Sequence, residues 1–347
     1  MCCNSLRIIP FFEFTEKILY YSLSFMNRLT TLFRLLKPVL ICPVVSYYRL
    51  VHPTLLENSL AVFVFHDISD EPSEFCAKYD LNVPPTLFEY QIRFIKNHFN
   101  VISPDDLLES RIPPKAALIT FDDGFRSFFT NAIPILEKHQ VPCIIFLNMG
   151  PIKGEIFWSG LITYLSEKRP DFVQYLNTQI SPNSPNRPLF LSCSKEIVNS
   201  YLEQLGENFV NQVSAFVGAF AKEENLEQAS KKGSVFYGNH LFNHYVPLLM
   251  SDEELLESFV KNIDELKEYP NYRNMLSFPF GQPGSCFSER QVDLLLKNGA
   301  KKVFRSSATI NYDKNASYLD RIGLIFCHNS STKIWFQIFQ HQLKNFL

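Results

Sequence analysis

The sequence predicts an α/β fold in which parallel strands alternate with helices, and three observations favour it. Short apolar segments typical of buried strands recur along the chain, as at residues 61–65, 116–121 and 141–147. Segments with helical periodicity lie between them, and this alternation is typical of a parallel sheet or barrel. Two strand ends also carry ligand-binding residue types, an acidic pair at 122–123 and a histidine pair at 240 and 244. Ligands collect at such strand ends.

Capping signals place the helices between these strands. We expect Thr86 to cap a helix whose apolar residues fall on one face, and Ser103 with Pro104 to open the next. The segment 251–254 has the pattern of a capping box. A later helix begins at about Ser288 and is ended by Gly299.

The same pattern divides the chain into segments. Residues 1–56 are predicted to form an amphipathic extension, and residues 57–330 to form the α/β domain. The alternation is lost from about 154 to 232, which predicts a mainly helical insertion on one face of that domain. A terminal helix is expected over residues 331–347.

Composition excludes some functions. With 46% hydrophobic residues the 347-residue chain can bury a large core. Lys and Arg (33) nearly balance Asp and Glu (35), so nucleic-acid binding through phosphate neutralisation is not expected. The 8 cysteines are scattered without Cys-x-x-Cys spacing, which favours reduced thiols and a reducing compartment.

The apolar N-terminal residues could indicate a signal sequence or a membrane-spanning segment. Glu13 and Glu16 interrupt the first apolar run, and the run at 38–45 is too short to span a bilayer. We expect the extension to pack on the domain, with peripheral contact at a membrane surface as the alternative. The expected location is therefore cytoplasmic, at a membrane face in the second case.

The acidic pair and the histidine pair together indicate a metal site. Asp122-Asp123 alone is as compatible with a surface turn as with chemistry. His240 and His244 have the spacing of one helical turn, but Pro247 favours a strand-end loop instead. Two histidines and one carboxylate form a common ligand set for zinc or a similar divalent ion. The second carboxylate is then free to act as a base.

These residues resemble motifs of the polysaccharide deacetylases, carbohydrate esterase family 4. Residues 120–124 (Thr-Phe-Asp-Asp-Gly) and 240–244 (His-Leu-Phe-Asn-His) are similar to the first two motifs of that family. Residues 277–281 (Ser-Phe-Pro-Phe-Gly) resemble the third motif. The resemblance spans most of 61–326 apart from the insertion. It implies a distorted (β/α) barrel with fewer than eight regular repeats, and metal-dependent removal of N-acetyl groups from a sugar.

The resemblance also implies a role for each matching residue. Asp122 would be the general base, and Asp123, His240 and His244 would hold the metal, zinc in first place with cobalt as an alternative. The metal would polarise the amide carbonyl and lower the pKa of its bound water. The backbone N–H of Phe280 would help to hold the oxyanion.

Two departures from the family pattern leave roles open. The third motif often has an arginine where this chain has Ser277, so the partner of the base must come from elsewhere. Arg126, Arg305 and Arg321 are the candidates, and Arg321 is preferred, although it could equally be a solvated surface charge.

The general acid is the second open role. His328 is a poor match to the usual late motif. The segment 65–67 (Phe-His-Asp) resembles members that deacetylate exported glucosamine polymers, which favours His66. The alternative is that His66 only bonds a backbone group at its strand end.

The predicted function is hydrolysis of the N-acetyl group of an N-acetylhexosamine in a polysaccharide or a lipid-linked glycan. Two alternatives remain: a hydrolase of a non-sugar amide on the same fold, and a non-catalytic glycan-binding relative.

Overall fold

The computed structural model describes residues 56–179, 189–206 and 209–344. They belong to one compact unit, Thr54–Leu347. The extension predicted over residues 1–56 lies outside the described residues except for Leu56, so its predicted packing or membrane contact stays a prediction. No helix in the described part of the chain has the length and hydropathy needed to cross a bilayer.

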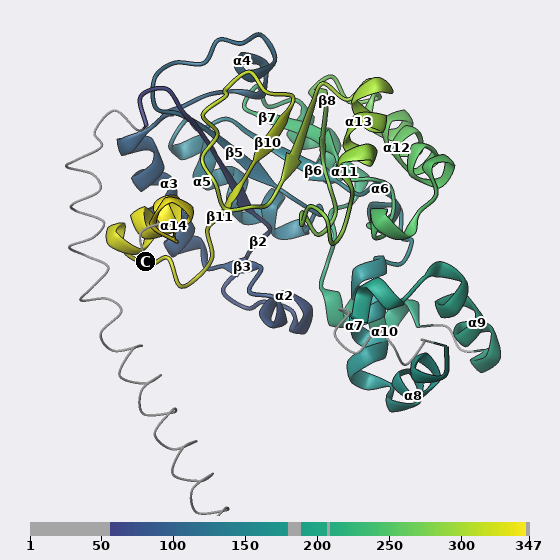
Figure 1. The fold of residues 1–347 in the computed structure, drawn as a ribbon. Coiled ribbons are helices and arrows are strands. Elements are labelled where there is room, and N and C mark those ends of the chain that lie inside the picture. Colours follow the sequence, from purple (N-terminus) through teal and green to yellow (C-terminus); the bar gives the residue numbers. More distant parts are fainter. Residues whose placement is uncertain (1–55, 180–188, 207–208, 345–347) are drawn as a thin grey trace, which may run out of the picture. The chain divides into compact units, whose positions relative to one another are not determined.

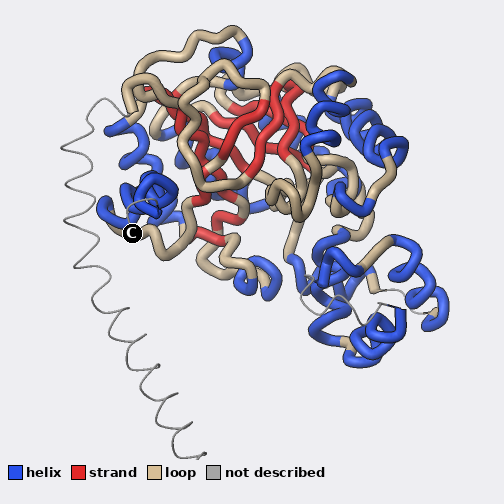
Figure 2. Tube along the Cα trace, viewed as in Figure 1, coloured by secondary structure: helices blue, strands red, loops and turns tan. Residues whose placement is uncertain are grey.

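A nearly closed parallel barrel forms the core, as the sequence predicts (Figures 1 and 2). Eight strands follow one another in the order β10-β9-β8-β7-β6-β5-β1-β11, and the short β4 pairs with β5. Every pairing is parallel. The strands are β1 (Leu60–Phe65), β4 (Asn100–Val101), β5 (Ala116–Phe121), β6 (Cys143–Leu147), β7 (Val235–Asn239), β8 (Tyr272–Ser277), β9 (Lys302–Arg305), β10 (Tyr318–Asp320) and β11 (Ile322–Gly323).

One short segment joins the two edges of this sheet. β10 pairs with β9, and β11, which begins two residues later, pairs with β1 at the other edge. Arg321 is the residue between them. The side chain of Asn311 strengthens the junction, since its Nδ2 donates to the carbonyls of Leu60 and Asp320. The chain therefore passes from one edge of the barrel to the other at Arg321.

Helices surround the strands, and most begin where the sequence predicts. Ser251 forms the expected capping box, and Ser103 and Ser288 begin their helices as predicted, each with a capping box that was not predicted from the sequence. The cap predicted at Thr86 is wrong, because the cap residue is Pro84 and the helix begins at Pro85, whose fixed φ suits the first helical position. The barrel helices are α2 (Glu74–Lys78), α3 (Pro85–His98), α4 (Pro104–Leu108), α5 (Ile133–Lys138) after a π-helical turn at Phe128–Ala132, α6 (Met149–Ile152), α12 (Asp252–Leu266), α13 (Glu289–Lys297) and α14 (Ser331–Lys344). A two-stranded sheet of β2 (Asp67–Ile68) and β3 (Asn82–Val83) follows β1.

The segment between β6 and β7 is mainly helical and has a core of its own. Phe157, Trp158, Phe172, Val213 and Phe216 are among its buried residues, which also include Phe75 and Cys76 of α2. Figure 1 shows α7 to α10 grouped together. Its helices are α7 (Trp158–Lys168), α8 (Pro170–Gln179), α9 (Lys195–Leu205), α10 (Val210–Val217) and α11 (Glu223–Ser230), with a 3-10 turn at Leu189–Ser192. The predicted insertion boundaries, about 154 and 232, stay predictions.

A buried asparagine on α12 fixes the strand ends that carry the site. Asn262 Nδ2 donates to the carbonyl of Leu147 and to Oδ1 of Asn239, both at 2.8 Å. Its Oδ1 accepts from the N–H of Met149 at 2.9 Å. One side chain thus ties the end of β6 to the end of β7.

Replacing this asparagine should cost stability because it leaves buried backbone groups without partners. We expect Asn262→Ala to lower the free energy of unfolding by about 1–3 kcal/mol. Urea unfolding measures the change. Asp264→Ala, at an exposed position of the same helix, is the control and should change it by less than about 0.5 kcal/mol. Equal losses in the two variants would contradict the structural role of Asn262.

Candidate metal and catalytic site

The acidic pair and the first histidine lie at neighbouring strand ends. Asp122 and Asp123 directly follow β5, and His240 directly follows β7. Asp123 adopts φ 73° and Gly124 φ 100°, so the chain turns sharply at the end of the strand. Such a left-handed conformation costs energy for a residue other than glycine, and such residues cluster at active sites and ligand clamps. His244 is also left-handed, at φ 57°, and it lies in a loop as predicted.

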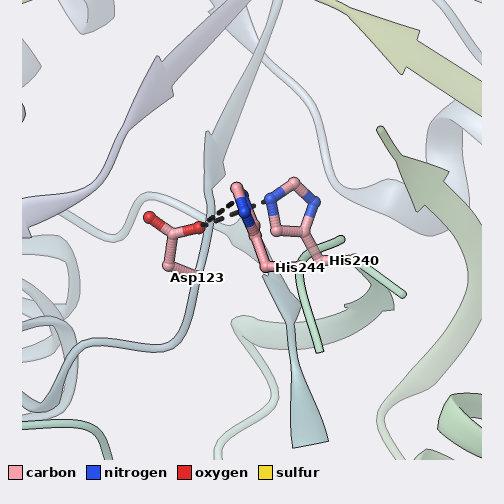
Figure 3. Close-up of side chains that lie close together, drawn as sticks. All are labelled: Asp123, His240 and His244. Carbon is pink, nitrogen blue, oxygen red and sulfur yellow. Dashed lines mark ion pairs between the residues drawn. The ribbon is translucent and has the colours of Figure 1, made fainter. Parts of the chain in front are cut away.

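Three of the predicted residues converge in one buried cluster (Figure 3). Asp123 Oδ1 lies 3.4 Å from Nε2 of His240 and 3.3 Å from Nε2 of His244. The three potential ligand atoms lie within 4.8 Å of one another. The residues are only 3%, 1% and 7% exposed in that order. The structure thus brings Asp123, His240 and His244 together in a geometry that can hold one ion.

Both imidazoles are oriented through their other ring nitrogen. Nδ1 of His240 bonds the carbonyl oxygen of Ser277 at 2.7 Å, so it is the protonated, donating nitrogen. Nδ1 of His244 bonds Oγ of Ser159 on α7. Burial lowers the pKa of His244 to about 3, which keeps its imidazole neutral. Because the carbonyl of Ser277 accepts from Nδ1 of His240, Nε2 of that ring is free to bind a metal, and Nε2 of His244 is free in the tautomer whose Nδ1–H donates to Ser159 Oγ.

The charge balance of the cluster fits a cation. Asp123 Oδ1 is buried and accepts no hydrogen bond from the described residues. Burial acts to raise the pKa of Asp123, but the surrounding imidazoles hold it below its usual value. An ionised carboxylate that is buried without a counter-charge is costly. A divalent ion between Asp123 and the two histidines would supply that charge, and the donor set of one carboxylate and two imidazoles suits it.

Asp122 has its own counter-charge, supplied by Arg321. Nη1 and Nη2 of Arg321 donate to Oδ1 and Oδ2 of Asp122, each at 2.7 Å, in a bidentate pair. Arg321 is only 1% exposed, so the prediction that it replaces the missing arginine is confirmed and the surface-charge alternative is wrong. Arg305 pairs instead with Asp320, and Arg126 is exposed. Burial acts to raise the pKa of Asp122, but the charge and hydrogen bonds of Arg321 together with the nearby imidazoles outweigh it and hold that pKa far below its usual range.

The predicted acid lies beside this pair, and the predicted oxyanion donor lies beside the metal cluster. His66 Nε2 is 3.9 Å from Asp122 Oδ2, and its side chain is 26% exposed. The ring of Phe280 packs on that of His244 with centroids 4.8 Å apart, and Phe280 is left-handed at φ 62°. A cavity of about 850 Å³ contacts His66, Phe280, Asp122 and the three cluster residues.

His328, the competing candidate for the acid, is engaged elsewhere. Its Nδ1 accepts a hydrogen bond from the backbone N–H of Ile325 at 3.0 Å. Burial lowers the pKa of His328 to about 4, and the residue does not line the cavity at the cluster. The geometry therefore favours His66.

Two supporting residues were not predicted from sequence patterns. Ser277 looks like a loss when compared with the family motif, yet its Oγ donates to Asp122 Oδ2 at 3.3 Å and its carbonyl holds His240. Ser159 reaches His244 from the helical segment, 85 residues earlier in the chain. No local pattern marks such a serine, and only the pairing of segments far apart in sequence reveals it.

Comparisons with known proteins find sequence similarity to polysaccharide deacetylases. The family described as "Polysaccharide deacetylase" matches residues 109–178. A poly-beta-1,6-N-acetyl-D-glucosamine N-deacetylase of Staphylococcus aureus is 21% identical over 252 residues, covering 64% of this chain and 83% of the relative. The enzyme of that name from Escherichia coli is 27% identical over 93 residues, covering 25% of this chain and 13% of the relative.

Two solved structures share the fold. IcaB from Ammonifex degensii gives a TM-score of 0.53 at 17% identity, covering 80% of this chain and 97% of its own. The Streptococcus pyogenes deacetylase PplD, in complex with acetate, gives a TM-score of 0.51 at 16% identity, covering 77% of this chain and 92% of its own. At these identities the likeness shows the barrel fold alone.

The hydrogen bond from Ser159 leads to a prediction about metal affinity. Ser159→Ala should weaken zinc binding by about 10–100-fold, because His244 loses the partner that fixes its ring and tautomer. Competition with a chromophoric chelator measures the dissociation constant. Ser166→Ala is the matched control, since Ser166 on the same helix bonds only the carbonyl of Ile162. If both variants bound zinc as tightly as the wild type, Ser159 would have no part in the metal site.

Proposed function

Because the chain belongs to the polysaccharide deacetylase family, we propose that it is a metal-dependent hydrolase that removes N-acetyl groups from an N-acetylhexosamine. The observation that carries the proposal is the buried cluster of Asp123, His240 and His244 directly beside a carboxylate held by arginine. The names of the curated relatives, which are N-deacetylases of a glucosamine polymer, support the choice of bond.

Asp123, His240 and His244 would hold the metal, and zinc suits their mixture of nitrogen and oxygen ligands, with cobalt as the alternative. When bound, a divalent ion acts as a Lewis acid toward the amide carbonyl and lowers the pKa of a water molecule. The carbonyl of Ser277 holds His240 in the tautomer that such binding requires, and Ser159 Oγ can accept from Nδ1 of His244 in the same tautomer.

Asp122 is the proposed general base. Its Oδ2 lies 4.0 Å from His240 Nε2 and 3.9 Å from His66 Nε2, so this oxygen faces both the cluster and the cavity. Arg321 keeps the carboxylate ionised and fixes its plane. Asp122 takes one proton from the attacking water while the water oxygen bonds to the amide carbon.

The remaining steps fall to Phe280 and His66. The N–H of Phe280 donates to the carbonyl oxygen as negative charge develops on it. His66 gives a proton to the sugar nitrogen as the carbon–nitrogen bond breaks, so the products are acetate and a free amine. The glycan that carries the sugar is a polysaccharide or a lipid-linked precursor.

Acetate release tests this function directly. Wild type should release acetate from N-acetylglucosamine oligomers or from lipid-linked N-acetylglucosamine. A chelator should abolish release, and zinc or cobalt should restore it. Asp122→Asn should reduce kcat by about 10²–10⁴-fold while zinc remains bound, because the base is lost but the ligands are not. Asp264→Asn changes an exposed acid that does not line the cavity, so it serves as control and should match wild type.

The contrary results distinguish the alternatives. Chelator-resistant release, or full activity in Asp122→Asn, would contradict the mechanism. Zinc binding without acetate release from any sugar would indicate a hydrolase of a non-sugar amide. Sugar binding by a chain that binds no zinc would indicate a non-catalytic relative.

Paired histidine variants test the general acid. His66→Gln should lower kcat by about 10²–10⁴-fold with unchanged zinc affinity, because leaving-group protonation is lost. His328→Gln should leave kcat close to the wild-type value, since His328 bonds the backbone of Ile325 outside the cavity. The reverse ranking of the two variants would assign the acid to His328.

A further inference from the structure

The cavity at the metal cluster is far larger than an acetyl group requires. Its volume is about 850 Å³, within the range of pockets that enclose whole drug-sized ligands. Beyond the cluster it continues between α2 and α7, where side chains of both helices line it. The extra space, here called the apolar arm, is defined by Phe75, Tyr79, Leu81, Phe157, Trp158 and Ile162.

Aromatic and aliphatic side chains make up most of the wall of the apolar arm. Phe75, Phe157, Trp158 and Ile162 also belong to the buried core of the helical segment, so they present rigid apolar faces. Close to the cluster the wall is again aromatic, since the rings of Phe190 and Phe280 stack at 4.9 Å. This surface has little to offer the hydroxyl groups of a glycan.

The polar groups of the arm are already paired with one another. Lys78 of α2 forms an ion pair with Glu167 of α7. The hydroxyl of Tyr79 bonds Oγ1 of Thr163 at 3.1 Å. Ser166 Oγ donates to the carbonyl of Ile162 at 2.6 Å. A second chain of sugars in the arm would therefore lose hydration without gaining many hydrogen bonds, whereas a hydrocarbon chain needs none.

We infer that the apolar arm binds a hydrocarbon chain of the substrate. The inference rests on the proposed function, and it narrows the substrate class to an N-acylated amino sugar that carries a lipid. The arm is continuous with the metal cluster, so the chain and the scissile amide belong to one molecule. The chain is either the aglycone of the sugar or a long N-acyl group, and these two sources share the same chemistry.

Three substrate series test the inference. The first has methyl, butyl and octyl glycosides of N-acetylglucosamine. The second has glucosamine acylated with acetyl, butanoyl and octanoyl groups, and the third has N-acetylglucosamine oligomers. We expect kcat/KM to rise in the first or the second series, by up to about 4-fold for each methylene group that is fully buried. The series that rises identifies which end of the substrate lies in the arm.

A variant in the arm makes the test independent of substrate solubility. Leu81→Gln places an amide in the wall, so it should remove most of the gain with chain length while leaving the rate on the methyl glycoside unchanged. Leu248→Gln changes an exposed leucine that does not line the cavity, and it should keep the full gain.

Two outcomes separate this inference from the proposed function. If kcat/KM does not change with chain length and rises instead in the oligomer series, the arm does not bind a hydrocarbon chain. The proposed deacetylase function is unaffected by that result. No acetate from any compound in the first and third series overturns the proposed function itself.

Discussion

The buried ion pair between Arg321 and Asp122 is the interaction on which the site depends. Arg321 lies where the chain crosses from β10 to β11, so the residue that closes the barrel also holds the proposed base. Such a pair adds little to net stability, because desolvation offsets the attraction, although losing one partner costs about 3–5 kcal/mol. The role of the ion pair is therefore to fix the position of Asp122. The barrel must close in this register for Asp122 to face the cluster.

The same pair explains why the site calls for a metal. Two adjacent carboxylates are buried, and Arg321 neutralises only Asp122. Asp123 is left with two imidazoles whose Nδ1 atoms are already engaged by Ser277 and Ser159. Protonating His244 is opposed by burial, which lowers its pKa to about 3. A divalent cation is the simplest way to balance the remaining charge, and it gives Asp122 and Asp123 separate roles.

Sequence patterns predicted the features that depend on neighbouring residues. They left open the contacts between segments that are far apart in sequence. The acids at the end of β5 and the histidine after β7 follow from strand-end placement, and Pro247 correctly favoured a loop for His244. Choosing Arg321 among three arginines needed the closure of the sheet, which no periodicity encodes. Ser159 escaped notice because its partner lies on another segment. The N-terminal extension and the cytoplasmic or membrane-face location stay predictions.

The helical segment between β6 and β7 has more than one connection to the site. Ser159, at the start of α7, orients His244, and Phe157 packs against the ring of the same histidine with centroids 4.8 Å apart. Trp158, between them, lines the apolar arm. Three consecutive residues thus link the metal cluster to the wall that faces the substrate. A shift of α7 would move His244 and the wall of the apolar arm together, because Phe157, Trp158 and Ser159 lie within one turn. The metal cluster and the wall of the apolar arm therefore both depend on the position of this helix.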